Sequence, residues 1–333
     1  MKRKVSVKVV MLMVSLMVVL SAPIMARAAK EAQLASLQVN ARMAVMQGPS
    51  GFGTVALNRD GGRIDETTSV EVSVYPSPNE VIARLANGEL DFAALPTNVA
   101  ANLYAKGVKV KVAAVTGEGM LMFLTNDATI TELDDLAGRK ISIPGAGSTP
   151  DQMTRILITA LGYDSQTDVE LDYSIAAPAQ LAQMLIAGRI DLAVLPEPFV
   201  SMARRSSDKI IPLLDVQALW SALTGTGNYP MTVVVVSDAF VAAHPESVAT
   251  ILNAIKDSVE WVNSNPAEAG KMIEEAGIMK ATMAEPAIPY CNLVFRTAKE
   301  SYDSMDTYLK VLYGFDFASV GGAVPDATFY LDF

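Results

Sequence analysis

The chain has 333 residues, of which 51% are hydrophobic, so it is not disordered and is long enough for two domains. Its 36 acidic and 26 basic residues give a formal net charge of −10, which argues against a nucleic-acid-binding protein because such proteins need a basic surface. One cysteine and one histidine exclude an internal disulfide, a zinc site built on cysteines and any mechanism that needs two histidines.

The first 28 residues have the order of a secretory signal peptide. A basic head with Lys2, Arg3, Lys4 and Lys8 precedes the apolar run 9–20, and small residues then stand at Ala26 and Ala28. Twelve apolar residues are fewer than the ~20 that span a bilayer as a helix, although an uncleaved anchor is the alternative. No cysteine closely follows the run, so no lipid anchor is expected there. We predict export to the periplasm, cleavage near Ala28 and a soluble mature protein.

The rest of the chain alternates between short apolar runs, typical of buried strands, and amphipathic runs, typical of helices. We predict strands near residues 39–46, 70–75, 90–95, 108–115, 120–125, 139–143, 168–174, 190–195, 209–214 and 231–236. We predict helices near residues 53–58, 78–87, 98–106, 131–136, 150–161, 178–187, 198–206, 245–263, 266–276 and 299–313. This alternation favours an α/β fold with mostly parallel sheets that are flanked by helices.

One helix–strand unit occurs twice, at residues 85–96 and 185–196. Six of its twelve positions are identical at a spacing of 100 residues, namely Leu85/Leu185, Gly88/Gly188, Asp91/Asp191, Ala93/Ala193, Leu95/Leu195 and Pro96/Pro196. A repeat of domain size indicates two related lobes rather than a solenoid. The apolar run 231–236 reads as a strand that returns to the first lobe. We therefore predict a discontinuous lobe 1 (36–120 and 232–333) and a lobe 2 (121–231).

The repeat extends upstream to a glycine-rich turn in each lobe, at residues 47–53 and 144–150. Each turn lies between a strand and a helix, and α/β proteins bind ligands at the carboxyl ends of strands. The plain alternative is that these glycines only make tight turns. Because both the turns and the Leu-Pro strand ends are matched, we predict a ligand site between the lobes. The candidate residues are Gly48, Ser50, Gly51, Phe52, Thr97, Asn98, Gly147, Ser148, Thr149, Glu197 and Tyr229.

The candidate cleft loops are 48–53, 96–98, 145–150, 196–199 and 225–231. They contain neither lysine nor arginine, so an anion would have to be held by backbone N–H groups and hydroxyls. Glu197 is the one charge among the candidates and could accept hydrogen bonds from a ligand N–H group, or it could cap the helix that follows it. Phe52 and Tyr229 could stack on a flat ring or belong to the core. We favour a small nitrogen-containing heterocycle, with a sulfonate- or nitrate-like anion as the alternative.

The chain resembles the type II periplasmic substrate-binding proteins of ABC importers, in the nitrate/sulfonate/taurine and thiamine-precursor-like group. The resemblance covers nearly all of residues 36–333. It is carried by the signal peptide and by the segments 48–51, 88–98, 133–142, 195–199, 244–247, 263–266, 288–292 and 319–322. This resemblance implies a monomeric two-lobe clamshell, without cofactor or metal, that closes on a small molecule and delivers it to a permease in the inner membrane.

Two other functions are compatible with the same fold. Some relatives make the thiamine pyrimidine or act in menaquinone synthesis, but the pyrimidine synthases need an active histidine and a cysteine-rich stretch. This chain offers only His244, which reads as the entrance to a helix, and Cys291 in an apolar run. The second rival is a periplasmic ligand-sensing partner protein. We predict that the protein is not an enzyme.

Overall fold

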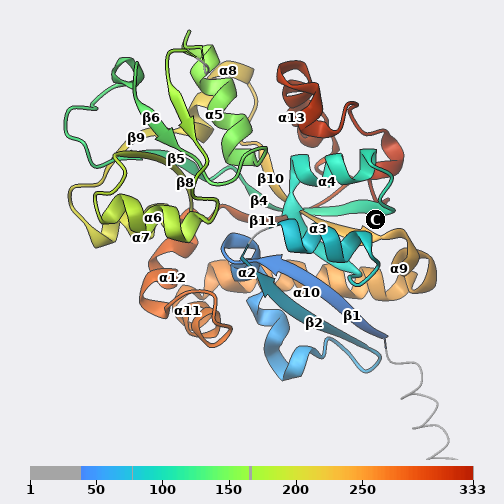
Figure 1. Cartoon of the computed structure of the whole chain (residues 1–333). Helices are drawn as coiled ribbons and strands as arrows, with labels where there is room; N and C mark the ends of the chain where they lie inside the picture. Colours follow the sequence, from blue (N-terminus) through green and yellow to red (C-terminus); the bar gives the residue numbers. More distant parts are fainter. Residues whose placement is uncertain (1–38, 77, 165–166, 333) are drawn as a thin grey trace, which may run out of the picture.

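A computed structural model describes residues 39–76, 78–164 and 167–332. The predicted signal peptide, 1–28, and the first residues assigned to lobe 1, 36–38, lie outside these ranges. Two lobes lie side by side, each built on one sheet with helices against it (Figure 1). In Figure 1 the blue to cyan N-terminal segment and the orange and red C-terminal segments form lobe 1, and the green to yellow middle of the chain forms lobe 2.

Lobe 1 contains a six-stranded sheet in the order β11-β4-β10-β3-β1-β2. Strand β1 pairs in parallel with β2 and β3, whereas β10 runs antiparallel to both β3 and β4, and β11 antiparallel to β4. The returning strand expected from the valine run is therefore present in the centre of this sheet. The strands are β1 (Val39–Met46), β2 (Thr68–Tyr75), β3 (Phe92–Pro96), β4 (Val110–Glu118), β10 (Pro230–Ser237) and β11 (Leu293–Thr297).

Lobe 2 contains a five-stranded sheet in the order β7-β6-β8-β5-β9. Strand β6 is parallel to β7 and β8, whereas β5 is antiparallel to β8 and β9. The α/β class is confirmed, but both sheets are mixed. Strands β5 and β10, the first strands after the chain crosses from one lobe to the other, run antiparallel to their neighbours. The strands are β5 (Leu121–Thr125), β6 (Lys140–Ser142), β7 (Glu170–Asp172), β8 (Leu192–Pro196) and β9 (Ile211–Asp215).

Helices cover both sheets (Figure 1). The longest, α10, buries Val248, Ile251, Leu252 and Ile255 against the lobe 1 sheet, as its apolar stripe predicts. Lobe 1 carries α2 (Pro49–Gly53), α3 (Pro78–Ala86), α4 (Thr97–Ala105), α9 (Asp238–Ala243), α10 (Pro245–Ser264), α11 (Pro266–Glu275), α12 (Ala281–Ala287) and α13 (Tyr302–Phe315). Lobe 2 carries α5 (Thr149–Ala160), α6 (Pro178–Ile186), α7 (Phe199–Ser206) and α8 (Val216–Thr224). Short 3-10 helices are η1 (Val55–Gly62), η2 (Leu133–Leu136), η3 (Ile288–Tyr290), η4 (Phe317–Val320) and η5 (Ala327–Phe329).

The sequence prediction missed strand β11 and four helices, α2, α8, α9 and α12, of which α2 lies in the predicted glycine-rich turn 47–53. Strand β11 forms one edge of its sheet and is only partly buried, so its residues lack a clear apolar pattern. Helices α8, α9 and α12 are short, and α12 contains Pro286, which sequence patterns treat as a helix breaker. The expected helices at 53–58 and 131–136 are instead 3-10 turns in large part.

The repeated unit forms the same local structure in both sheets. Helices α3 and α6 each end before a glycine in the left-handed region, Gly88 with φ 72° and Gly188 with φ 64°. The following strands, β3 and β8, are almost entirely buried in the first and second sheets, respectively. Left-handed glycine caps let the chain reverse from helix to buried strand within a few residues.

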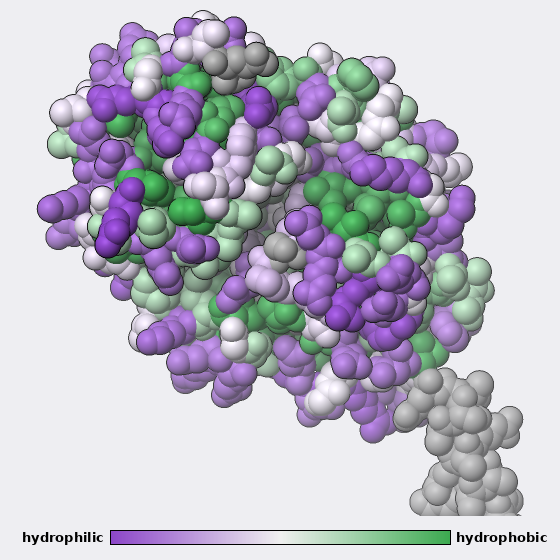
Figure 2. All heavy atoms as spheres, in the orientation of Figure 1, coloured by the Kyte–Doolittle hydropathy of each residue, from purple (hydrophilic) through white to green (hydrophobic). Residues whose placement is uncertain are grey.

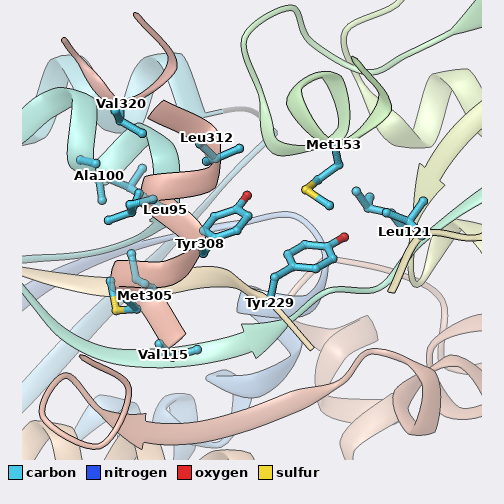
Figure 3. Packing of buried hydrophobic residues seen from close by; sticks show 14 of the residues in the cluster. Leu95, Ala100, Val115, Leu121, Met153, Tyr229, Met305, Tyr308, Leu312 and Val320 are labelled. Carbon is cyan, nitrogen blue, oxygen red and sulfur yellow. The ribbon is translucent and has the colours of Figure 1, made fainter. Parts of the chain in front are cut away.

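The hydrophobic core is continuous between the lobes. One cluster combines Leu95 and Leu312 of lobe 1 with Leu121 and Met153 of lobe 2. Figure 3 shows Met153 and Leu121 on one side of the ring of Tyr229, with α13 on the other. Within the described ranges, no helix is both long and apolar enough to span a membrane.

Candidate ligand-binding site

A cavity of ≈ 360 Å³ lies between the lobes at the carboxyl ends of β1, β2, β3, β6 and β8. This volume is at the small end of the range of roughly 300–1,000 Å³ for small-molecule sites. Figure 2 shows hydrophobic residues gathered on the surface over α3 and α4, the helices that contribute Ile82 and Val99 to the cavity. The lining residues are Met46, Gln47, Pro49, Ser50, Pro76, Pro78, Asn79, Ile82, Pro96, Val99, Met120, Pro144, Gly145, Ala146, Gly147, Ser148, Thr149, Pro150, Ala176, Pro178, Pro196, Phe199, Met231 and Thr232.

The cavity wall is apolar and without charge. Of the described residues that line it, none is Asp, Glu, Lys, Arg or His, and eight are prolines. Three methionines, one phenylalanine and the aliphatic Ile82 and Val99 add further apolar surface. The side chains that can hydrogen-bond are all neutral, being amides and hydroxyls.

Four of the residues predicted from the sequence line the cavity: Ser50, Gly147, Ser148 and Thr149. The hydroxyls of Ser50, Ser148 and Thr149 already have hydrogen-bond partners within the protein. Ser50 Oγ accepts a hydrogen bond from Met46 N (3.0 Å), and Ser148 Oγ donates to the carbonyl oxygens of Pro144 (2.8 Å) and Gly145 (2.6 Å). These bonds hold the two turns at the ends of β1 and β6 in place.

Asn98, which does not line the cavity, joins the two lobes behind its wall. The amide lies on α4 and is almost fully buried. Its Nδ2 donates to Gly147 O (2.9 Å), and its Oδ1 accepts from Thr149 Oγ1 (3.1 Å). The neighbouring candidate Thr97 is buried inside lobe 1, where its hydroxyl donates to Pro230 O (2.8 Å).

The remaining candidates of the first turn lie beside the cavity rather than on its wall. Phe52 is fully buried in a lobe 1 cluster with Val259 and Ile288. Gly48 faces lobe 2, since a Cβ there would lie 3.9 Å from the Phe199 ring. Gly51 is packed so closely that a Cβ would lie 3.0 Å from Met46 O.

Glu197 caps the helix that follows it. The carboxylate accepts hydrogen bonds from Ser201 N (2.9 Å) and Ser201 Oγ (3.0 Å) in the first turn of α7. Burial raises the pKa of Glu197 above its usual value, although the two bonds from Ser201 act in the opposite direction. Glu197 is not part of the cavity wall. The geometry therefore supports the capping role that the sequence left open.

Tyr229 belongs to an aromatic cluster at the junction of the lobes. Its ring is fully buried and stacks on Tyr308 of α13 with a centroid distance of 5.5 Å and an interplanar angle of 16°. Trp220 of α8 meets both tyrosine rings edge-on at 5.6 Å. Figure 3 shows the two tyrosine rings side by side, with Met153 beside them. Burial raises the pKa of Tyr229 well above its usual value.

The sequence analysis missed the loop 76–79, which contributes Pro76, Pro78 and Asn79. This loop follows β2, so the rule that ligands bind at the carboxyl ends of strands would have found it. Met120 was also missed, because it lies next to a crossing between the lobes, where sequence patterns carry no site signal. Met231 belongs to the candidate loop 225–231 but was not singled out as a site residue.

The two residues considered for catalysis lie away from the cavity wall. Cys291 is buried, and its burial raises the pKa of the thiol well above the usual value. The negative charge of the nearby Glu197 is a smaller cause in the same direction. Such a thiol is a poor nucleophile at neutral pH. His244 precedes α10 and packs on Phe240, with ring centroids 5.1 Å apart. Across the described part of the chain, no group of three His, Cys, Asp or Glu residues could hold a metal ion.

Comparison with known proteins finds a matching family and solved structures with a similar fold. The chain matches the model of the NMT1-like family over residues 51–276. A solved structure of an ABC transporter from Parabacteroides distasonis is 27% identical over 88% of this chain and 98% of its own length, with a TM-score of 0.74. The periplasmic aliphatic sulphonate binding protein of Escherichia coli is 13% identical over 88% of this chain and 91% of its own, with a TM-score of 0.70.

A more distant likeness is the periplasmic nitrate-binding protein of Synechocystis PCC 6803, 14% identical over 71% of this chain and 66% of its own, with a TM-score of 0.59. No curated protein sequence matches the chain. The solved structures show that the chain has the two-lobe fold of periplasmic binding proteins. Because the family model spans more than half of the chain, the chain belongs to the NMT1-like family.

Proposed function

We propose that the protein is the solute-binding component of an ABC importer. In this role it captures a small organic molecule in the cavity between its lobes and delivers it to a permease in the inner membrane. The observation that carries the proposal is the ≈ 360 Å³ cavity, which takes its wall from both lobes and from the carboxyl ends of strands in both sheets. A site shared between two lobes lets a ligand stabilise the closed arrangement, which a partner can then recognise.

Export is part of this proposal. The basic head and apolar run of residues 1–28 favour a cleaved signal peptide, which would place the mature protein in the periplasm with Ala29 near its first residue. Intact-mass measurement of the exported protein tests this step. A mass that still includes residues 1–28, or an added acyl chain, contradicts it.

The binding role is tested by thermal unfolding of the exported protein with and without a metabolite extract. A ligand at a hundredfold excess over its dissociation constant adds ~2.7 kcal/mol to the free energy of unfolding, which raises Tm measurably. Val99→Trp fills the cavity and should abolish this rise. Leu223→Trp, on an exposed position of α8 outside the cavity, is the matched control and should retain it.

Two outcomes contradict the binding role at this cavity. One is an extract that never changes Tm at any concentration. The other is a Val99→Trp variant that folds and keeps the full ligand-dependent rise.

A further inference from the structure

Resting on the proposed function, we infer that the captured solute is an uncharged, largely apolar molecule that carries only one or two neutral hydrogen-bonding groups. The cavity wall among the described residues has no ionised side chain, and its apolar atoms come mainly from proline, methionine and aliphatic residues. A charged ligand group moved from water into such a site without a partner loses much more solvation free energy than the wall returns. The wall therefore selects against both anions and cations.

Three of the helices that begin at the cavity are poorly suited to hold an anion. A helix N-terminus binds anions through free backbone N–H groups, and proline has none. Helices α3 and α6 begin at Pro78 and Pro178, and Pro150 is the second residue of α5. All three prolines line the cavity and replace a donor with ring carbons.

The N-terminus of α5 also holds an anion of its own. Asp151 Oδ2 accepts a hydrogen bond from Gly147 N (2.7 Å), in the loop that lines the cavity. A ligand anion would have to compete with this carboxylate for the same end of the helix and would be repelled by it.

The nearby acids do not offer a site for a cation either. Asp151 Oδ1 accepts from Arg155 Nε (2.8 Å) and from the Tyr173 hydroxyl (2.7 Å), so both oxygens of this carboxylate already have partners within the chain. Glu197 is engaged by Ser201, and neither acid lines the cavity. An ammonium group in the cavity would find no carboxylate on the wall.

Two neutral side chains remain available to orient a ligand. Asn79 of α3 and Thr232 of β10 line the cavity, and neither side chain hydrogen-bonds to any part of the chain that the structure describes. They lie in different elements of lobe 1, so a ligand with one or two hydroxyl, carbonyl or amide groups could bond to them. The other polar side chains of the wall, Gln47, Ser50, Ser148 and Thr149, already have hydrogen-bond partners within the chain.

The first test sorts the ligand by charge. A metabolite extract is separated at pH 7 on anion- and cation-exchange resins, and the unretained material is passed over a reversed-phase column. We expect the Tm of the full exported protein to rise with the uncharged, reversed-phase-retained fraction. A rise with the anionic, cationic or unretained zwitterionic fraction alone overturns this inference but leaves the binding role intact. No rise with any fraction contradicts the binding role itself.

The second test adds a charge to the wall. Hexan-1-ol and hexane-1-sulfonate are the probes, and their dissociation constants are measured by calorimetry. Wild-type protein should bind the alcohol more tightly than the sulfonate. Asn79→Lys should tighten sulfonate binding about tenfold, because the new ammonium supplies the missing partner. Asn87→Lys, an exposed position just after the same helix and outside the cavity, is the matched control.

The control variant should leave the affinity for the sulfonate near the wild-type value. Tighter binding of the sulfonate than of the alcohol by wild-type protein overturns the inference. An equal gain in both lysine variants, or none in Asn79→Lys, shows that the wall does not set the charge preference and overturns it as well.

Discussion

Asn98 Oδ1 accepts a hydrogen bond from Thr149 Oγ1 at 3.1 Å, and through this contact the first turn of α4 in lobe 1 is tied to the first turn of α5 in lobe 2. The same amide donates to Gly147 O at 2.9 Å. Both partners line the cavity, whereas Asn98 lies behind it. One buried side chain thus joins the lobes beside the ligand site and holds the turn that forms part of its wall.

Asn98→Ala should weaken ligand binding by favouring the open arrangement of the lobes. Two hydrogen bonds between the lobes are lost, each worth about 1 kcal/mol, so we expect affinity to fall about tenfold or more. Calorimetric titration measures the affinity, and small-angle scattering should show a larger apo radius of gyration.

Thr97→Val is the matched control for this variant. It removes the bond from the neighbouring hydroxyl to Pro230 O, which lies inside lobe 1. The control should lower the free energy of unfolding by about 1 kcal/mol but leave the affinity near wild type. Equal affinity in Asn98→Ala and wild type would contradict the role of Asn98 between the lobes.

Glu197→Gln should leave ligand affinity unchanged and alter the pH dependence of stability. Burial raises the pKa of Glu197 in the folded state, so between pH 4.5 and that raised pKa the folded state binds more protons than the unfolded state. The free energy of unfolding of wild type should therefore fall, relative to the variant, as the pH increases through this range. Urea unfolding at several pH values measures the difference. A difference that does not change with pH would contradict the raised pKa, and an affinity that falls about tenfold would contradict the capping role.

The fold was largely predictable because its signals are local. Buried strands such as β3 and β8 are apolar runs, α10 has a clear apolar stripe, and the repeat at Gly88 and Gly188 indicates two lobes. The pairing of the strands was less predictable, because the sequence of β10 does not indicate which strands it pairs with or in which direction. The lobe boundaries, 36–120 with 232–333 and 121–231, remain our proposal. The membership of the two sheets supports it, except that β10 of the lobe 1 sheet begins at Pro230, two residues before the proposed boundary.

The sequence predicted where in the fold the site lies, but not which side chains line it. Loops after β1, β3, β6 and β8 do surround the cavity. Which residue faces inward depends on packing. Phe52 and Tyr229 are large enough to be core residues, and Glu197 turns to the N–H and hydroxyl of Ser201 instead of the cavity. Chain order alone cannot distinguish these orientations.

Trp220 should report ligand binding through its fluorescence. The indole is buried on α8 of lobe 2 and meets Tyr308 of lobe 1 edge-on, so movement of the lobes changes its surroundings. Trp261 lies on α10 of lobe 1 beneath the Arg59 guanidinium, 3.7 Å from the ring centre. Trp261→Phe should keep the ligand-induced emission change, and Trp220→Phe should lose it. The reverse result would mean that the lobes do not move at this junction.

Because the helix–strand unit occurs in both lobes, the same glycine-to-alanine substitution should lower the free energy of unfolding equally in each. Gly88 and Gly188 cap α3 and α6 with φ values of 72° and 64°, and a Cβ at either position would meet nothing within 4 Å. Alanine there should therefore cost only the left-handed backbone strain, about 1 kcal/mol at each site. The two sites lie in different sheets, so the double variant should lose the sum of the two costs, roughly 2 kcal/mol.

Chemical denaturation of Gly88→Ala, Gly188→Ala and the double variant measures these costs, and Gly314→Ala serves as the control. Gly314 lies inside α13, has no left-handed φ and has open space where a Cβ would be placed. The same glycine-to-alanine change should stabilise the protein there by about 0.5–1 kcal/mol, because alanine favours the helix. Ligand affinity should not change in any of the variants, since none of these glycines lines the cavity. A cost confined to one lobe would show that the two units are not physically equivalent, despite their six identities.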